Sequence, residues 1–188
     1  EDVSKDLDIV LVLDNSCYMK DKTEQLVTVT IEWVTKYYSR TNLRFALVTA
    51  PSSNPALDGL VTLEQNFSNA RDFIAILQAQ YYSPDNSFEA TIDAIYDIST
   101  PSNPLGLNWS GSNKITIVYS DEEPHTYRNP GLTEEQAFNE AKNNNVLVYV
   151  FTDSLILWRW NGWNSQAFPD NITLEKTFDE IIAANFCR

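Results

Sequence analysis

The stretch Asp8–Asp21 reads DIVLVLDNSCYMKD, an apolar run that ends abruptly in side chains carrying oxygen atoms. Ile9–Leu13 has no polar face, so the strand predicted here is covered on both sides, as in a parallel sheet flanked by helices. In open α/β sheets, ligands gather beyond the carboxyl ends of the strands, where Asp14 and Ser16 lie. The sequence therefore predicts a buried strand with a ligand site at its end.

The rest of the chain alternates between strand and helix patterns. Further buried strands are predicted over 44–50, 114–120 and 146–151. The segment 57–67 alternates polar and apolar residues and is too polar for the centre of a sheet, so we expect an edge strand linked to the second strand by a hairpin. Helices are expected after the first strand and over 69–79, 88–98, 133–143 and 175–186.

Two helix starts carry capping signals: Asn69 alone, and Thr133 together with Gln136 as a capping box. The apolar residues expected on the buried helix faces are Leu26, Val29, Trp33, Tyr37, Phe73, Ile76, Leu77, Ala90, Ala94, Ile95, Ile98, Phe178, Ile181, Ile182 and Phe186. The pattern predicts a single α/β domain over residues 1–188. It is a doubly wound, mostly parallel sheet with one antiparallel edge strand and helices on both faces.

The composition excludes several classes of protein. The 188 residues are 43% apolar and 12% aromatic, which is typical of a folded domain and not of a disordered tail. A net charge of -13 argues against nucleic acid and anionic membranes as partners. No run approaches the roughly 20 apolar residues that cross a bilayer, so no membrane insertion is expected. Residues 1–4 are not a signal peptide, and the chain looks processed or excised.

The cysteines and the sequons bear on the cellular compartment. Cys17 and Cys187 lie at opposite ends of the predicted topology and are not expected to pair; Cys17 is expected to be packed, and Cys187 free or joined to something outside this segment. Asn66, Asn108 and Asn171 begin glycosylation sequons, although the Asn content predicts roughly three by chance. These triplets are compatible with an extracellular glycoprotein.

No enzyme motif is apparent. A Ser-His or Cys-His nucleophile would depend on His125, the single histidine, and no Gly-x-Ser-x-Gly precedes a helix. No glycine-rich phosphate loop is present. We therefore expect a protein that is not an enzyme, with a metal-dependent hydrolase that activates water at the acidic rim as the alternative.

The strand-end motifs resemble those of the von Willebrand factor A domain family, and within it the A-like domain of integrin β subunits. Residues 14–18 resemble the Asp-x-Ser-x-Ser of the family's metal-ion-dependent adhesion site (MIDAS), and 19–21 resemble the integrin β Met-Lys-Asp. Residues 83–90 are similar to the integrin β loop Ser-Pro-Glu-Gly-Gly-Phe-Asp-Ala, and 117–121 to the fourth-strand segment that ends in Asp. The resemblance spans nearly the whole chain.

The resemblance implies a site for Mg²⁺ or Ca²⁺, cations that take oxygen ligands. The metal ligands that it implies are Asp14, Ser16, Asp85 and Asp121, with Asp21 beginning an adjacent metal site. The motif departs from the family at Tyr18, which replaces the second Ser and is too long to copy its hydroxyl. At the adjacent metal sites it departs at Lys22, Gln80 and Tyr82, where oxygen ligands are expected.

The function that the resemblance implies is cell adhesion by an extracellular protein-interaction domain, in which a carboxylate of a protein ligand completes the metal coordination. Tyr18 and Asn86 flank this site as candidate partner contacts. Trp158, Trp160 and Trp163 form a dense aromatic segment, which either covers the sheet edge and the last helix or exposes a patch for a protein or glycan. The alternative function is therefore metal-independent binding, or a structural scaffold module of a larger secreted protein, with a vestigial metal site.

Overall fold

β1 (Leu7–Leu13) is a central strand of a six-stranded sheet, and all seven of its residues are buried. The structure, a computed structural model, describes residues 6–14, 16, 19–39, 42–50, 61–80, 90–110, 113–128, 130–168 and 171–186. The sheet order is β3-β2-β1-β4-β5-β6. The other strands are β2 (Leu43–Thr49), β3 (Thr62–Ser68), β4 (Asn113–Tyr119), β5 (Val146–Thr152) and β6 (Asn164–Ala167).

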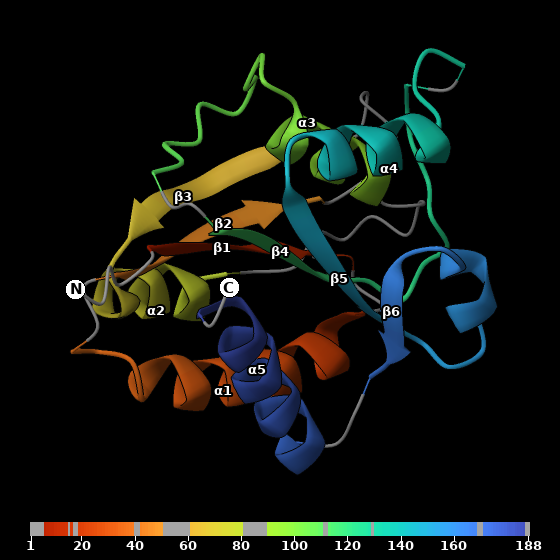
Figure 1. Ribbon diagram of the computed structural model, residues 1–188. Helices are drawn as coiled ribbons and strands as arrows, with labels where there is room; N and C mark the ends of the chain where they lie inside the picture. The colour runs from red at the N-terminus through yellow and green to blue at the C-terminus, as the bar shows by residue number, and fades with distance from the viewer. Residues whose placement is uncertain are drawn as a thin grey trace.

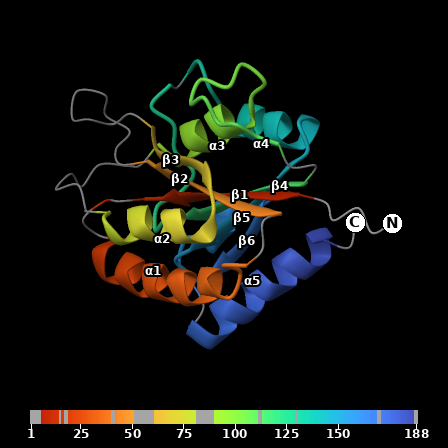
Figure 2. The same ribbon diagram turned by 90° about the vertical axis from the view of Figure 1, so that its left-hand side faces the viewer.

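Every neighbouring pair in the sheet is parallel except β2 and β3, which pair antiparallel at one edge. Helices cover both faces, as Figures 1 and 2 show: α3 (Thr91–Ser99) and α4 (Glu134–Asn143) on one face, and α1 (Lys20–Thr35), α2 (Ala70–Gln78) and α5 (Asn171–Phe186) on the other. This confirms the predicted fold class, including the antiparallel edge strand.

The two cores follow from the alternation of side chains along β1. Ile9, Leu11 and Leu13 enter the core beneath α1, α2 and α5, where Trp33 and Phe178 also pack. Val10 and Val12 enter the second core beneath α3 and α4. Since both faces of the strand are covered, an apolar side chain is favoured at every position, which explains the absence of a polar face.

The two predicted helix caps are confirmed, whereas α5 begins at Asn171, earlier than predicted. The Asn69 side chain accepts a hydrogen bond from the backbone N–H of Asp72 at 3.1 Å. At α4, the Thr133 hydroxyl accepts from the N–H of Gln136, whose side chain accepts from the N–H of Thr133. Each cap satisfies a backbone N–H that the helix itself leaves without a partner.

The structure also differs from the predictions in three places. β6 was not predicted, and it pairs with β5 although its sequence, Asn-Ser-Gln-Ala, is polar. In α2 it is Ile74 that is fully packed, while Ile76 is only partly buried. Tyr37 lies beyond the end of α1, and its hydroxyl donates to Asp179 of α5 at 3.0 Å. In the part of the chain that the structure describes, no helix has the length and apolar character needed to span a membrane.

Candidate functional site

The carboxyl ends of β1, β4 and β5 carry a group of polar side chains that we call the rim cluster. Because these three strands are parallel neighbours, the residues that follow them reach the same edge of the sheet. The cluster consists of Asp14 and Ser16 after β1, Lys22 in the first turn of α1, Ser120 and Asp121 after β4, and Asp153 after β5. The topology thus brings together Asp14, Ser16 and Asp121, three of the residues singled out from the sequence.

Asp14 is fully buried, and both of its carboxylate oxygens accept hydrogen bonds. The backbone N–H of Ser16 donates to Oδ1 at 3.0 Å, and the hydroxyl of Ser120 donates to Oδ2 at 2.8 Å. The backbone N–H of Asp14 donates to the carbonyl of Tyr119 at 2.9 Å. The carboxylate is therefore fixed between the ends of β1 and β4.

Burial raises the pKa of Asp14 to about 7, because a charged carboxylate loses its water shell there. The backbone N–H of Ser16 and the hydroxyl of Ser120, which donate to the carboxylate, lower this pKa by stabilising the ionised form. The negative charge of Asp121 raises it. Among the described residues, no Lys or Arg forms an ion pair with Asp14, so its negative charge has no protein counter-ion there.

Lys22 joins two other carboxylates of the rim cluster. Its Nζ donates to Asp153 Oδ2 at 3.1 Å and to Asp121 Oδ2 at 3.3 Å. Burial lowers the pKa of Lys22, but the hydrogen bonds and charges of Asp153 and Asp121 outweigh it, so the pKa rises overall. The N–H of Leu155 and the ammonium of Lys22 lower the pKa of Asp153. These pairings keep Lys22 and Asp153 charged at neutral pH.

Some oxygen atoms of this edge are buried without a hydrogen-bond partner among the described residues. They are Ser16 Oγ, Asp121 Oδ1 and Thr152 Oγ1. Buried polar atoms are normally paired, because an unmade hydrogen bond costs about 1–3 kcal/mol. Carboxylate and hydroxyl oxygens of this kind are the ligands that hard divalent cations take in proteins.

The other buried carboxylates of the described chain each pair with an arginine. Besides Asp14, the buried acidic residues are Asp8, Asp93 and Asp97. Arg44 donates to both oxygens of Asp8, at 2.8 and 2.7 Å. Arg128 binds both oxygens of Asp97 and lies 2.9 Å from Asp93 Oδ1. Asp14 is thus the one of these four buried carboxylates that pairs with no described arginine, while Asp93 and Asp97 share Arg128.

The donors present fit a hard divalent cation in kind, since Asp14, Ser16 and Asp121 offer carboxylate and hydroxyl oxygens. In number they are few: within the described residues, no group of three or more His, Cys, Asp or Glu is arranged to hold a metal ion. Asp85, Asn86 and Tyr18 lie outside the described residues, as do Cys17 and Cys187. Asp21 is exposed on the first turn of α1, and no hydrogen bond or ion pair joins it to the described rim cluster.

The three tryptophans have separate roles. Trp160 is fully buried, packs in the core beneath α3 and α4, and donates from Nε1 to the carbonyl of Glu122 at 3.0 Å. Trp163 packs edge-on against Phe138 of α4. Trp160 therefore does not belong to an exposed patch, because its ring fills the core. Trp163 packs against α4 and also lines the pocket between the edge strand β6 and α5.

The exposed part of this segment is small. Leu155 is 81% exposed and Trp158 is 66% exposed, and both follow β5 close in sequence to Asp153. The guanidinium of Arg159 lies over the Trp158 ring, 4.0 Å from its centroid. η3 (Leu157–Trp160) thus presents one exposed indole beside the rim cluster and buries the other.

The sequons lie in different environments. Asn108 is exposed. Asn66 is partly buried in β3, where its Nδ2 donates to the carbonyl of Gly106 at 2.8 Å and its Oδ1 accepts from the N–H of Asn108 at 3.0 Å. The side chain of Asn171 is outside the described part. Of the two sequons whose side chains the structure describes, Asn108 is the more exposed.

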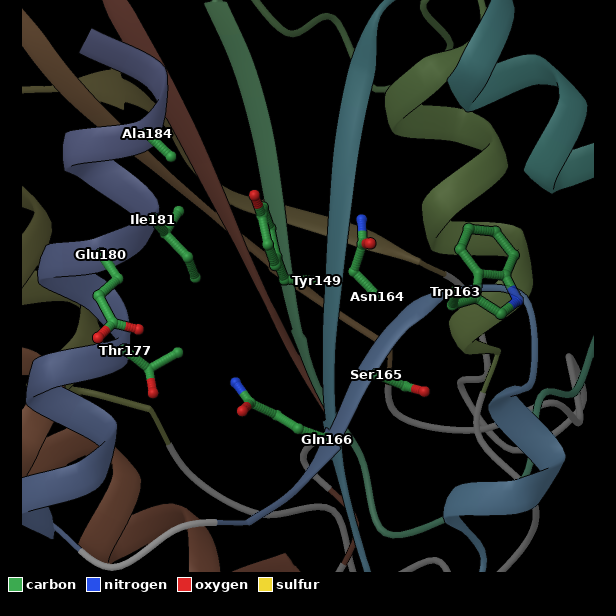
Figure 3. A pocket seen from close by; sticks show the side chains of 9 residues that line it. All are labelled: Tyr149, Trp163, Asn164, Ser165, Gln166, Thr177, Glu180, Ile181 and Ala184. Atoms are coloured by element: carbon green, nitrogen blue, oxygen red, sulfur yellow. The ribbon is translucent and has the colours of Figure 1, made fainter. Parts of the chain in front are cut away.

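A separate pocket of about 400 Å³ lies between β6 and α5 (Figure 3). Its lining side chains include Tyr149 and Gln166 on the sheet side and Thr177, Glu180 and Ile181 on the helix side. No residue of the rim cluster lines it. The pocket is a groove along an edge strand and does not extend the candidate site.

Comparison with known proteins agrees with this architecture. The von Willebrand factor type A domain family matches residues 8–166, so the chain belongs to that family. A search of curated proteins found no match. The solved structures it resembles include proximal thread matrix protein 1 from the mussel byssus, with a TM-score of 0.67 and 13% identity over 97% of this chain and 46% of that one.

Two further structures show the same fold. The pilus adhesin SpaC from Lactobacillus rhamnosus GG, in an open conformation, has a TM-score of 0.65 and 12% identity over 97% of this chain and 30% of that one. A second structure of the mussel protein, with a zinc-occupied MIDAS motif, has a TM-score of 0.65 and 12% identity over 95% of this chain and 48% of that one. The chain spans less than half the length of each of these proteins.

Two contacts of the rim cluster, and one pairing elsewhere in the fold, were missed from the sequence. Ser120, the direct partner of Asp14, stands just before Asp121, and its position at the end of a buried strand was a usable signal. Lys22 was noted as a lost metal ligand, and its bond to Asp153 depends on the order of the strands. The Arg128 pairing with α3 joins residues 31 positions apart and had no local signal.

Proposed function

We propose that this chain is a non-enzymatic protein-interaction domain of the adhesion type, which binds its partner at the rim cluster. The observation that carries the proposal is the uncompensated charge of Asp14. Every other buried acidic residue in the described chain faces an Arg, whereas Asp14 faces buried oxygens that have no described partner. An arrangement that is costly without a ligand is expected where a ligand binds.

The ligand set favours a divalent metal as part of this site. Asp14, Ser16 and Asp121 would hold it, together with Asp85, which the resemblance to integrin β subunits assigns to the same site. When bound, the metal would supply a coordination position for a carboxylate oxygen of the partner. In this chain Asp14 provides the buried negative charge, Ser120 orients it, and Ser16 supplies the hydroxyl.

The relatives support this class of function. One similar structure is described as a pilus adhesin, one as a thread matrix protein of the byssus, and one carries zinc at a MIDAS motif. We infer an extracellular or cell-surface location and an integrin-β-like variant of the family, the latter from Met19, Lys20 and Asp21. Among the sequons with described side chains, we expect glycosylation at Asn108, which is exposed, rather than at Asn66, which is partly buried.

A displayed library of random peptides tests the proposal without knowledge of the partner. Selection in the presence of Mn²⁺ is expected to enrich peptides with Asp or Glu, and their binding should be lost in a chelator and in Ser16→Ala. Thr28→Ala, which removes an exposed hydroxyl of α1, is the matched control and should bind normally. Peptides that bind equally well in chelator and to Ser16→Ala would refute a metal-dependent site.

A second candidate is metal-independent binding through Leu155 and Trp158. The observation that favours it is their exposure, 81% and 66%, beside the rim cluster. Trp and neighbouring Arg side chains are enriched at binding hot spots. If this surface is the binding site, peptides selected in chelator will lose binding to Leu155→Ser and Trp158→Ser while binding Ser16→Ala unchanged. The hydrolase alternative predicts turnover of an ester or phosphate that Asp121→Ala abolishes.

A further inference from the structure

Lys22 occupies a defined position at the rim cluster. Its ammonium lies 3.1 Å from Asp153 Oδ2, 3.3 Å from Asp121 Oδ2 and 5.4 Å from the ring centroid of Phe168. These contacts reach three separate segments, after β4, after β5 and after β6. The side chain is 36% exposed, so the ammonium is partly withdrawn from water.

The two oxygens of Asp121 have different surroundings. Oδ2 accepts the hydrogen bond from Lys22, whereas Oδ1 is buried and has no hydrogen-bond partner among the described residues. The Ser16 hydroxyl is orphaned in the same way. Asp121 therefore binds the Lys22 ammonium through Oδ2, whereas its Oδ1 has no described partner.

A metal at that open position would share a carboxylate with the ammonium of Lys22. Two cations on one carboxylate repel each other, and the repulsion is only partly screened because the Asp121 side chain is 12% exposed. Asp153 also accepts a hydrogen bond from Lys22 and so compensates for part of the ammonium's charge. In this chain of hydrogen bonds, however, Lys22 stands between Asp153 and Asp121.

We propose that Lys22 is an internal cation that weakens divalent metal binding at the rim cluster and so sets the metal concentration at which the site fills. The inference rests on the proposed function, since it takes Asp121 as a metal ligand. It makes Lys22 a determinant of affinity and not only a lost metal ligand.

Calorimetric titration with Mg²⁺ and Mn²⁺ alone tests this in three variants. Lys22→Gln removes the charge at similar length and is expected to raise the affinity at least about tenfold over wild type. Lys22→Arg keeps the charge and should bind with wild-type affinity within about threefold. Lys20→Gln makes the same change in net charge on the same exposed turn of α1 and serves as the control, with a change below about threefold.

The shift in Tm on adding metal gives a second readout, and it should be larger in Lys22→Gln than in wild type. Binding of equal affinity in wild type and Lys22→Gln would overturn the inference and leave the proposed metal site standing. Metal binding by Lys22→Gln but not by wild type would support the inference and show that the wild-type site does not bind metal at the concentrations used. Absence of binding in both, with intact circular dichroism, would overturn the inference together with the metal site.

Discussion

The two ends of β1 each carry a fully buried aspartate, yet their surroundings are opposite. At the amino end, Asp8 accepts two hydrogen bonds from Arg44 and a third from the N–H of Ser110. At the carboxyl end, Asp14 accepts hydrogen bonds from Ser16 and Ser120, and no described Lys or Arg pairs with it. The Asp8 carboxylate is paired with an arginine, and this ion pair stabilises the fold. The Asp14 carboxylate has no described cationic partner, and it is here that we place the ligand.

Arg44→Met should have the largest effect on stability. It removes the guanidinium that donates to both oxygens of the fully buried Asp8, and breaking such a pair costs about 3–5 kcal/mol. Chemical denaturation at neutral pH measures the free energy of unfolding. Arg159→Met is the matched control: its partner Glu123 is 38% exposed, so the loss should not exceed about 1 kcal/mol. Equal losses in both variants would show that Asp8 does not depend on Arg44.

The next effect is the dependence of stability on pH that Asp14 imposes. Burial raises the pKa of Asp14 to about 7, so between about pH 4 and pH 7 the folded chain holds a proton that the unfolded chain has released. The contribution of Asp14 to stability is therefore fully present near pH 4 and is lost as the pH rises to 7. In metal-free buffer, the free energy of unfolding of wild type relative to Asp14→Asn should fall across this range. A constant difference from pH 4 to pH 8 would contradict the raised pKa.

The serines around Asp14 should show a smaller effect. Ser120→Ala removes the hydroxyl that donates to Asp14 Oδ2 and should cost about 1–2 kcal/mol. Ser16→Ala removes a buried hydroxyl without a described partner and should change the metal-free stability by less than about 0.5 kcal/mol. Thermal and chemical unfolding of the two variants measure this directly. A larger loss in Ser16→Ala than in Ser120→Ala would mean that the Ser16 hydroxyl has a structural partner.

Much of the fold could be predicted because its signals are local. The unbroken apolar run of β1 predicted a strand covered on both faces, and the Thr133 and Gln136 pair predicted the start of α4. β6 could not be predicted, because Asn-Ser-Gln-Ala is a strand only through its pairing with β5. Trp158 and Trp160 stand two residues apart in one segment, and only the packing of η3 buries one and exposes the other.

For the candidate site, the residues at the strand ends could be found but their partners could not. Asp14, Ser16 and Asp121 follow apolar strands, and parallel pairing brings them to one edge. The Arg44 partner of Asp8 depends on the register between β1 and β2, which places these two residues opposite each other. The bond from Lys22 to Asp153 likewise depends on β5 lying next to β4. Charge compensation is a property of the assembled sheet, so the contrast between Asp8 and Asp14 emerges only there.

The central claim is that Asp14 is left without a counter-ion because a cation completes it, and the Tm of Asp14→Asn with and without metal tests this most directly. At pH 7.5 without metal, Asp14→Asn should be more stable than wild type, because the amide keeps the shape and lacks the buried charge. Saturating Mg²⁺ or Mn²⁺ should raise the Tm of wild type and leave that of Asp14→Asn unchanged. Asp8→Asn, the same substitution at the other end of β1, should lower the Tm and keep the metal response. An Asp14→Asn protein that is less stable than wild type without metal, or that responds to metal equally, would contradict the account.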